Sequence, residues 1–345
     1  MGPSDCDSKC KQEICGREAI TMYILNDDIA LHSYANLLFC YTRLGNERPV
    51  RLTTDEFITL KKCDGQTDIE YDEVLKKLID DKVIRPVKDS DDRLKKWQEH
   101  RISDNPFTPC MTLAITEKCN FNCMHCFNAV DSGIPSNHLS YDQITYIIDE
   151  AYNAGILQFK ITGGEPLVHP EFTKIVNYIY DNGMWIYMLN TNGYLLDADM
   201  LDMLRRLPVI PQINISYDGI GFHDKMRGVT GAQSRTLAAI KSCVDADVPL
   251  QVTLNINKLN EDVILPSLIM LDEMGVSSAR VIRTTEAPRW KEKSGAALMS
   301  WRDYYEKSLA ITEGYMAEDH FIFSFFEYRG RVRSEVPPIP GMFLR

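Results

Sequence analysis

The sequence has 345 residues, of which 44% are hydrophobic and 25% are charged, and its formal net charge is -11. These values are typical of a globular protein with one large domain and one small one. The acidic balance argues against nucleic-acid binding as the main activity. No apolar run approaches the roughly 18 residues that a membrane span needs. The first residues are polar and lack the apolar stretch of a signal peptide. We therefore expect a cytoplasmic protein without a membrane or nucleic-acid partner.

Residues 1–18 form a polar tail that carries Cys6, Cys10 and Cys15. A second metal site is one interpretation of three cysteines so close together. The alternative is a disordered terminus, because no fourth ligand is evident. The sequence leaves open whether these cysteines bind metal.

Residues 19–87 predict a small α+β domain of the winged-helix type. Two segment pairs fit the capping box, in which a threonine hydroxyl and a glutamate three residues later satisfy the free amides of a helix start. These pairs are Thr53 with Glu56 and Thr67 with Glu70. Short strands rich in branched and aromatic residues are expected at residues 22–25, 37–42 and 83–87.

The pattern of this domain resembles the peptide-recognition element (RiPP recognition element) at the start of many peptide-modifying enzymes. An exposed sheet edge can bind an extended peptide by strand addition. DNA binding is disfavoured because acidic residues balance the lysines. A purely structural cap is the remaining alternative. Residues 88–108 are highly charged and then broken by Pro106 and Pro109, as is typical of a linker.

Three cysteines, Cys119, Cys123 and Cys126, lie within eight residues after a short apolar segment. Cysteines this close in a reducing compartment indicate a shared metal centre rather than disulfides. A structural zinc site needs four ligands, usually as two separated pairs, and no such partner is near. An iron-sulfur cluster is also held by thiolates, and with three of them one iron keeps an open position. Three unconnected core cysteines are the plainest alternative, as we expect for Cys40, Cys63, Cys110 and Cys243.

Residues 109–290 predict six apolar strands that alternate with helices. The strands are expected at 111–116, 157–162, 184–190, 209–216, 250–256 and 279–283. Helices are expected to begin at Ser140 and near Pro170, and to cover 197–206, 232–246 and 262–274. Right-handed crossovers curl such a parallel sheet, so we predict an α/β fold with a partial (β/α)6 TIM-like barrel. Active sites of barrel enzymes lie at the C-terminal ends of the strands.

Three motifs follow these strands: Cys119-x3-Cys123-x2-Cys126, Gly163-Gly164-Glu165-Pro166 and Ser216-x-Asp218-Gly219. Together they resemble the radical S-adenosylmethionine (SAM) superfamily. The one departure is His125, which stands where an aromatic residue is common.

The resemblance implies a [4Fe-4S] cluster held by the three cysteines, with SAM on its open iron. It assigns SAM contacts, with different weight, to Gly163, Gly164, Glu165, Pro166, Asn192, Ser216, Asp218, Arg227 and Asn255. Glycines allow a close backbone approach, and Glu165 is suited to pair with the methionine ammonium. Arg227 is suited to the methionine carboxylate, although a surface ion pair is the alternative, and strand-end asparagines such as Asn257 often only complete turns. No catalytic base is evident.

The segment His223-Asp-Lys-Met-Arg-Gly228 resembles the branch of this superfamily that modifies peptides. The implied function is cleavage of SAM to a 5′-deoxyadenosyl radical, which abstracts hydrogen from a precursor peptide bound partly by residues 19–87. The product would be a thioether or carbon-carbon crosslink or an epimerised residue, and a flavodoxin or ferredoxin would donate electrons. Two alternatives are a radical enzyme for a small metabolite and a non-catalytic peptide-binding scaffold that keeps the cluster.

Residues 291–345 are expected to hold a helix around 301–315 and an aromatic segment, 321–328. The aromatic segment either packs in the core or lines a substrate groove. In the peptide-modifying branch, cysteines for auxiliary clusters follow the barrel, but this sequence has none after Cys243. We therefore expect either a shortened chain or chemistry that needs one cluster. Oligomeric state is not predicted.

Overall fold

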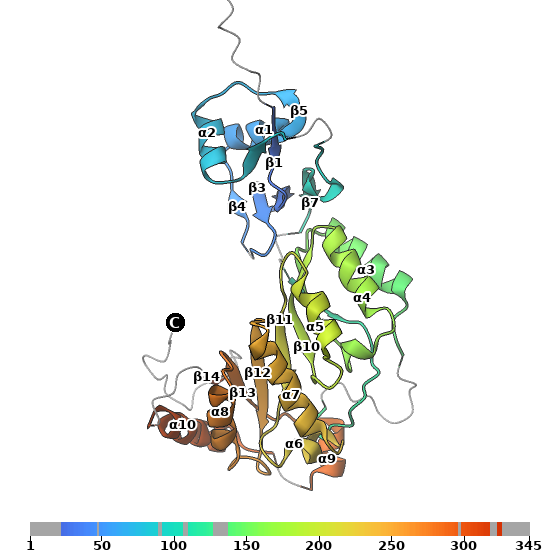
Figure 1. Ribbon diagram of the computed structural model, residues 1–345, viewed down its shortest axis with the longest axis vertical. Coiled ribbons are helices and arrows are strands. Elements are labelled where there is room, and N and C mark those ends of the chain that lie inside the picture. Colours follow the sequence, from blue (N-terminus) through green and yellow to red (C-terminus); the bar gives the residue numbers. More distant parts are fainter. Residues whose placement is uncertain are drawn as a thin grey trace, which may run out of the picture. The chain divides into compact units, whose positions relative to one another are not determined.

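The computed structural model describes residues 22–46, 48–88, 92–105, 110–126, 137–295, 298–317 and 323–325 (Figure 1). The predictions for Cys6, Cys10 and Cys15, for the prolines of the linker and for most of the C-terminal aromatic segment lie outside these residues. The chain divides into two compact units. Unit 1 comprises Met1–Phe121, Val130–Asn214 and Ala246–Pro249, and unit 2 comprises Asn122–Ala129, Ile215–Asp245 and Leu250–Arg345. No helix in the described part is long and apolar enough to cross a membrane.

Unit 1 begins with an α+β module built on two small sheets. Their strand orders are β5-β1-β6 and β4-β3-β2-β7. The strands are β1 (Met22–Leu25), β2 (Ile29–Tyr34), β3 (Leu37–Arg43), β4 (Val50–Arg51), β5 (Asp64–Asp68), β6 (Ile84–Pro86) and β7 (Arg101–Ser103). The helices are α1 (Thr54–Lys62), α2 (Glu73–Asp80) and the short 3-10 helix η1 (Lys96–Gln98). We did not predict β2, which is buried along its whole length and pairs with both β3 and β7.

The first predicted capping box is confirmed, and the second is wrong. Thr53 Oγ1 accepts the amide of Glu56 at 3.2 Å, and Glu56 Oε2 accepts the amide of Thr53 at 2.8 Å. Thr67 instead lies in β5, where its amide donates to Asp64 Oδ1 at 2.8 Å. Helix α2 begins after Asp72, whose carboxylate caps it. Aspartate and threonine are both favourable N-cap residues, so either Asp72 or Thr67 could start this helix. Thr67 is taken up by β5, which pairs with β1, and Asp72 becomes the cap.

The six predicted strands of the larger sheet are all present. They are β8 (Cys110–Ala114), β9 (Gln158–Thr162), β10 (Trp185–Thr191), β11 (Gln212–Ser216), β12 (Leu250–Ile256) and β13 (Ala279–Arg283), joined by β14 (Phe323–Phe325) from the aromatic segment. The strands follow one another in chain order across the sheet, and β8 with β9, β9 with β10, β12 with β13 and β13 with β14 pair in parallel. This confirms the α/β fold class with a partial TIM-like barrel.

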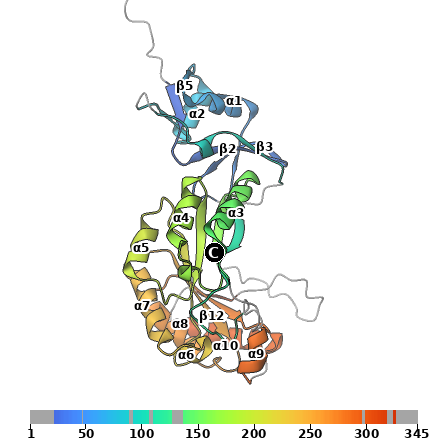
Figure 2. The same cartoon turned by 90° about the vertical axis from the view of Figure 1, so that its right-hand side faces the viewer.

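Helices alternate with these strands. They are α3 (Tyr141–Asn153), η2 (Pro166–Val168), α4 (Phe172–Asp181), α5 (Ala198–Arg205), α6 (His223–Arg227), α7 (Ala232–Asp245), α8 (Ile264–Glu273), α9 (Pro288–Lys293) and α10 (Trp301–Ala317). The buried face of α3 consists of Ile144, Ile148 and Ala151, which recur at helical spacing. In β9, Phe159 and Ile161 lie on the same face of the strand and are fully buried, whereas Lys160 on the other face is partly exposed. Within unit 1 the N-terminal module lies beside α3 and α4 (Figures 1 and 2).

Candidate functional site

In unit 1, the loops after β8 and β9 are joined by backbone hydrogen bonds. The Gly164 amide donates to the Thr116 carbonyl oxygen at 2.7 Å, and the Glu165 amide donates to that of Lys118 at 2.9 Å. A Cβ atom at Gly164 would lie 2.3 Å from the Lys118 carbonyl oxygen, and one at Gly163 would lie 2.4 Å from that of Thr116. The sequence suggested that these glycines admit a ligand. In the structure they admit the backbone that leads into Cys119.

Glu165 is almost fully buried, with 1% of its surface exposed, and its carboxylate accepts hydrogen bonds from two neighbouring loops. Oε1 accepts the amide of Leu167 at 3.1 Å and the hydroxyl of Thr191 at 2.8 Å, while Oε2 accepts the amide of Asn192 at 2.7 Å. The carboxylate thereby links the ends of β9 and β10. These donors fix the orientation of the carboxylate. Pro166 starts η2 directly behind it.

Asn192 reaches toward the cysteine segment from the end of β10. Its Nδ2 donates to Asn120 Oδ1 at 2.7 Å, and its Oδ1 accepts the amide of Tyr194 at 2.9 Å. Asn120 is the neighbour of Cys119, which is exposed. The asparagine thus completes a turn, as the sequence allowed, and also braces the residue next to the first cysteine.

In unit 2, the segment with Cys123 pairs with the short helix α6. The amide of Asn122 donates to the carbonyl oxygen of Arg227, and that of Met124 donates to the carbonyl oxygen of Met226, each at 3.0 Å. Cys123 is buried, and Arg227 Nη1 donates to its Sγ at 3.7 Å. Burial raises the pKa of the Cys123 thiol, and the Arg227 charge acts in the opposite direction.

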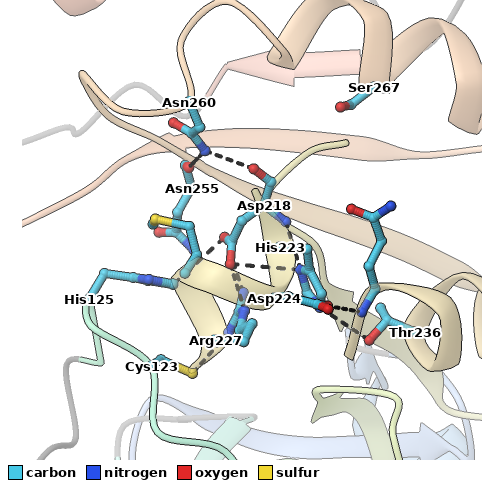
Figure 3. A network of polar contacts seen from close by, with 12 residues as sticks. Cys123, His125, Asp218, His223, Asp224, Arg227, Thr236, Asn255, Asn260 and Ser267 are labelled. Atoms are coloured by element: carbon cyan, nitrogen blue, oxygen red, sulfur yellow. Dashed lines mark hydrogen bonds and ion pairs between the residues drawn. The ribbon is translucent and has the colours of Figure 1, made fainter. Parts of the chain in front are cut away.

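Asp218 and Arg227 form the centre of a buried polar network in unit 2 (Figure 3). Arg227 Nε lies 2.6 Å from Asp218 Oδ2, and Nη2 donates to Oδ1 at 3.2 Å. Burial alone would raise the pKa of Asp218, yet Arg227 and two nearby histidines hold it below its ordinary value. Burial alone would lower the pKa of Arg227, but Asp218 raises it. Both groups are therefore charged at neutral pH.

His125 and His223 flank this ion pair. His125 Nε2 lies 3.6 Å from Asp218 Oδ1. His223 Nδ1 accepts the amide of Asp218 at 3.1 Å, and its Nε2 lies 3.2 Å from Thr236 Oγ1. Burial lowers the pKa of each histidine to about 4. Both rings are therefore neutral at pH 7, and Arg227 is the one cation beside Asp218 in the described part of the chain.

The remaining predicted residues of unit 2 lie at strand ends. Ser216 is half-buried at the end of β11. The carbonyl oxygen of Asn255 accepts Asn260 Nδ2 at 2.7 Å, and the same amide group donates to the Asp218 carbonyl oxygen at 2.8 Å. Asn257 is fully buried, where its Nδ2 donates to Thr284 Oγ1 at 3.3 Å. Asn257 has an internal, structural role.

Thr191, Asn260 and the role of His223 were not found from the sequence. Thr191 carries no sequence signal, because its partner Glu165 is supplied by another loop, and Asn260 bonds to Asp218, 42 residues earlier, as well as within its own loop. His223 did carry a signal: it lies four residues before the predicted Arg227 on a helix, so the two share a face. That spacing in His223-Asp-Lys-Met-Arg227 indicates a shared partner, and the partner is Asp218.

The thiols provide the chemistry that an iron-sulfur cluster requires. None of the seven cysteines that the structure describes forms a disulfide, and Cys119, Cys123 and Cys126 are among them. Within the described ranges, no three Cys, His, Asp or Glu side chains are grouped as a metal site. The assignment of the cluster to Cys119, Cys123 and Cys126 therefore remains a prediction. It is supported by the three thiols, which are the usual ligands of such clusters, and by the backbone hydrogen bonds that hold the cysteine segment.

Residues 113–265 match the sequence model of the Radical SAM superfamily. The chain carries a radical SAM domain. Members of this superfamily are enzymes that use a [4Fe-4S] cluster and SAM, so the predicted family and cofactors are confirmed at the level of the superfamily. The matched range contains all three predicted motifs.

Two curated relatives are similar to part of this chain. An AdoMet-dependent heme synthase of Methanosarcina barkeri is 35% identical over 169 residues, which are 48% of this chain and 48% of that protein. A PqqA peptide cyclase of Gluconobacter oxydans is 25% identical over 216 residues, 62% of this chain and 60% of that protein. The chain thus spans about half the length of the curated relatives that it matches.

The fold is similar to that of SuiB from Streptococcus suis. The structure of SuiB bound to the precursor peptide SuiA aligns with a TM-score of 0.63 and 14% identity, covering 89% of this chain and 73% of that one. SuiB bound to S-adenosylmethionine aligns with a TM-score of 0.60 and 12% identity, with the same coverage. Residues 109–345 are 237 of 345, or about 69%, so an alignment of 89% also includes part of the N-terminal module.

Proposed function

We propose that this chain is a radical SAM enzyme that modifies a ribosomally made precursor peptide. The observation that carries the proposal is the combination of a radical SAM domain with an N-terminal α+β module, an arrangement that the fold likeness to SuiB also includes. The similarity to a PqqA peptide cyclase supports the same substrate class. The product is a thioether or carbon-carbon crosslink, or an epimerised residue. The reaction takes place in the cytoplasm.

Cys119, Cys123 and Cys126 would hold the cluster in this proposal. When bound, the cluster and SAM supply a 5′-deoxyadenosyl radical that abstracts a hydrogen atom from the peptide. The protein contributes by fixing the cysteine segment: in unit 1 through Gly164 and Glu165, and in unit 2 through α6. An electron donor such as a flavodoxin or ferredoxin completes the system.

The residues proposed to contact SAM are Gly163, Gly164, Glu165, Pro166, Asn192, Ser216, Asp218, Arg227 and Asn255. Glu165 lies at the end of β9 with its carboxylate oriented by Leu167, Thr191 and Asn192, and a carboxylate is suited to pair with a methionine ammonium. Arg227 donates through Nη2 to Asp218 and through Nη1 to Cys123, and its guanidinium fork is of the kind that pairs with a carboxylate. Asp218 keeps this guanidinium in place.

A small-molecule substrate is the second candidate function. It is favoured by the relative with 35% identity, which is described as a heme synthase. In that case residues 19–87 act only as a cap, and turnover does not depend on them.

The test is anaerobic incubation of the reconstituted protein with SAM, a reductant and the precursor peptide encoded beside the gene. Mass spectrometry that detects 5′-deoxyadenosine together with loss of two hydrogens from the peptide supports crosslinking. Unchanged mass with deuterium uptake from solvent supports epimerisation. 5′-Deoxyadenosine with an unmodified peptide, but with conversion of a porphyrin, supports the second candidate. Peptide binding without any 5′-deoxyadenosine would leave only the non-catalytic scaffold.

A further inference from the structure

One buried guanidinium in unit 2 joins a predicted cluster ligand to a carboxylate. Arg227 Nη1 donates to Cys123 Sγ at 3.7 Å, while Nη2 donates to Asp218 Oδ1 at 3.2 Å. Figure 3 shows Arg227 with a dashed line to each of these two partners. All three residues are buried, with exposed fractions of 7% or less. An arginine is always charged in a protein, and solvent ions screen a buried charge poorly, so the Cys123 sulfur lies beside an effective positive charge.

Asp218 fixes the orientation of this guanidinium. Arg227 Nε lies 2.6 Å from Asp218 Oδ2 while Nη2 reaches Oδ1, so the carboxylate holds the planar group at two points. The backbone of Asp218 is held in turn, because its amide donates to His223 Nδ1 and its carbonyl oxygen accepts Asn260 Nδ2. Asp218, His223 and Asn260 are positioning residues, because they act on the sulfur only through Arg227.

The backbone on both sides of the cysteine is bonded to the helix that carries the guanidinium. The Asn122 amide donates to the Arg227 carbonyl oxygen, and the Met124 amide donates to that of Met226, each at 3.0 Å. A Cβ atom at Gly228 would lie 2.7 Å from the Asn122 carbonyl oxygen, so α6 and the cysteine segment are in close contact. The sulfur and its donor therefore keep a fixed distance from each other.

We infer that Arg227 raises the reduction potential of the cluster that Cys123 is proposed to hold. Reduction transfers one electron from the reductant to the cluster, without forming or breaking a bond, and makes the cluster more negative. Hydrogen bonds to the ligand sulfurs and nearby charge set the potential of such a cluster, and a cationic donor stabilises the more negative state. This role rests on the proposed function, but it acts at the sulfur and is separate from the proposed contact of Arg227 with SAM.

The test is a reductive titration of the reconstituted protein with dithionite, followed by electron paramagnetic resonance in the absence of SAM. The decisive variant combines Arg227→Met with Asp218→Asn. It removes the donor at the sulfur, leaves the net charge unchanged and leaves no buried charge unpaired. We expect the midpoint potential of the cluster to shift to a more negative value, so that at the wild-type midpoint the reduced fraction falls severalfold.

The matched control combines Arg302→Met with Glu306→Gln. These residues form an exposed ion pair on α10 with Arg302 Nε 3.0 Å from Glu306 Oε1, so the control also removes an arginine and a carboxylate. We expect the control to keep the wild-type potential and iron content.

Two results would overturn the inference. If the decisive variant keeps the wild-type potential, Arg227 and Asp218 only stabilise the fold. If it loses its iron while the control retains it, Arg227 is needed to hold the cluster rather than to set its potential. Failure of the proposed function looks different: a wild-type protein that binds the cluster but forms no 5′-deoxyadenosine is not a radical enzyme, and its potential can still be compared with that of the variant. A wild-type protein that binds no iron would remove the cluster site and this role of Arg227 together.

Discussion

Arg227 and Asp218 form a buried ion pair, with Arg227 Nε 2.6 Å from Asp218 Oδ2. Asp218 is fully buried and Arg227 is 7% exposed. The pair is anchored from both sides, since α6 supplies Arg227 and the loop after β11 supplies Asp218. Asn260 and His223 hold the backbone of Asp218.

Removing one charge of this pair should be costly. We expect Arg227→Gln to lower the free energy of unfolding by about 3–5 kcal/mol, because Asp218 is then a buried charge without its cation. Urea unfolding measures the change. The matched control is Arg205→Gln, which breaks an exposed pair with Asp202 at 3.8 Å and should cost at most about 1 kcal/mol. A double variant with Asp218→Asn should recover part of the loss. If the losses of unfolding free energy in the two single variants simply add up in the double variant, Arg227 and Asp218 do not stabilise each other.

The cysteine triplet should determine iron binding. We expect Cys119→Ala, Cys123→Ala and Cys126→Ala each to reduce iron after anaerobic reconstitution from about four atoms per chain to near zero. Iron and sulfide analysis with visible absorption measures this. Cys243→Ala is the control, because Cys243 is a buried thiol of α7 whose pKa burial raises to about 12. Full iron content in any triplet variant would remove that residue from the ligand set.

Gly164 should not tolerate a side chain. In Gly164→Ala, the new methyl group would meet the Lys118 carbonyl oxygen at 2.3 Å, so the segment before Cys119 must shift. We expect a loss of about 1–3 kcal/mol in the free energy of unfolding and weaker iron retention. Gly221→Ala is the control: its φ is +74°, with nothing within 4 Å, so it adds only backbone strain. Equal iron retention in both variants would argue against the close packing of the two loops.

Acid should destabilise the protein through His223. Its pKa is about 4 when folded, against an ordinary value of 6.5. The unfolded chain therefore binds the proton more readily, so this contribution to stability is complete above pH 6.5 and is lost as pH falls toward 4. The difference corresponds to about 3 kcal/mol.

His32 and His125 act in the same direction, so the measurement compares wild type with His223→Gln. The free energy of unfolding, measured by urea between about pH 7 and pH 4, should fall less steeply in the variant. Parallel curves would show that His223 is not buried as a neutral ring.

The sequence by itself determined the features that depend on neighbouring residues. The capping box at Thr53 and the helix start at Ser140 were predicted, and in both the capping partner, Glu56 or Gln143, lies three residues away. The alternation of apolar strands and helices fixed the fold class, and the spacing of the three motifs identified the superfamily. The predicted helix start at Thr67 was wrong because Asp72 is a second possible cap nearby. The pairing of β5, which contains Thr67, with the distant strand β1 decided between the two.

Only the tertiary structure decided which distant groups meet. Glu165 is fixed by Thr191 and Asn192, Arg227 by Asp218 and Cys123, and Tyr34 binds a carbonyl oxygen 121 residues further along the chain. A local hydrogen bond needs only a short turn of the chain, so the sequence pattern reveals it. A distant bond depends on how strands and helices pack first, and its residues carry no mark of their partner. For that reason the radical SAM motifs were readable in the sequence, while the place of the N-terminal module became visible only in the fold.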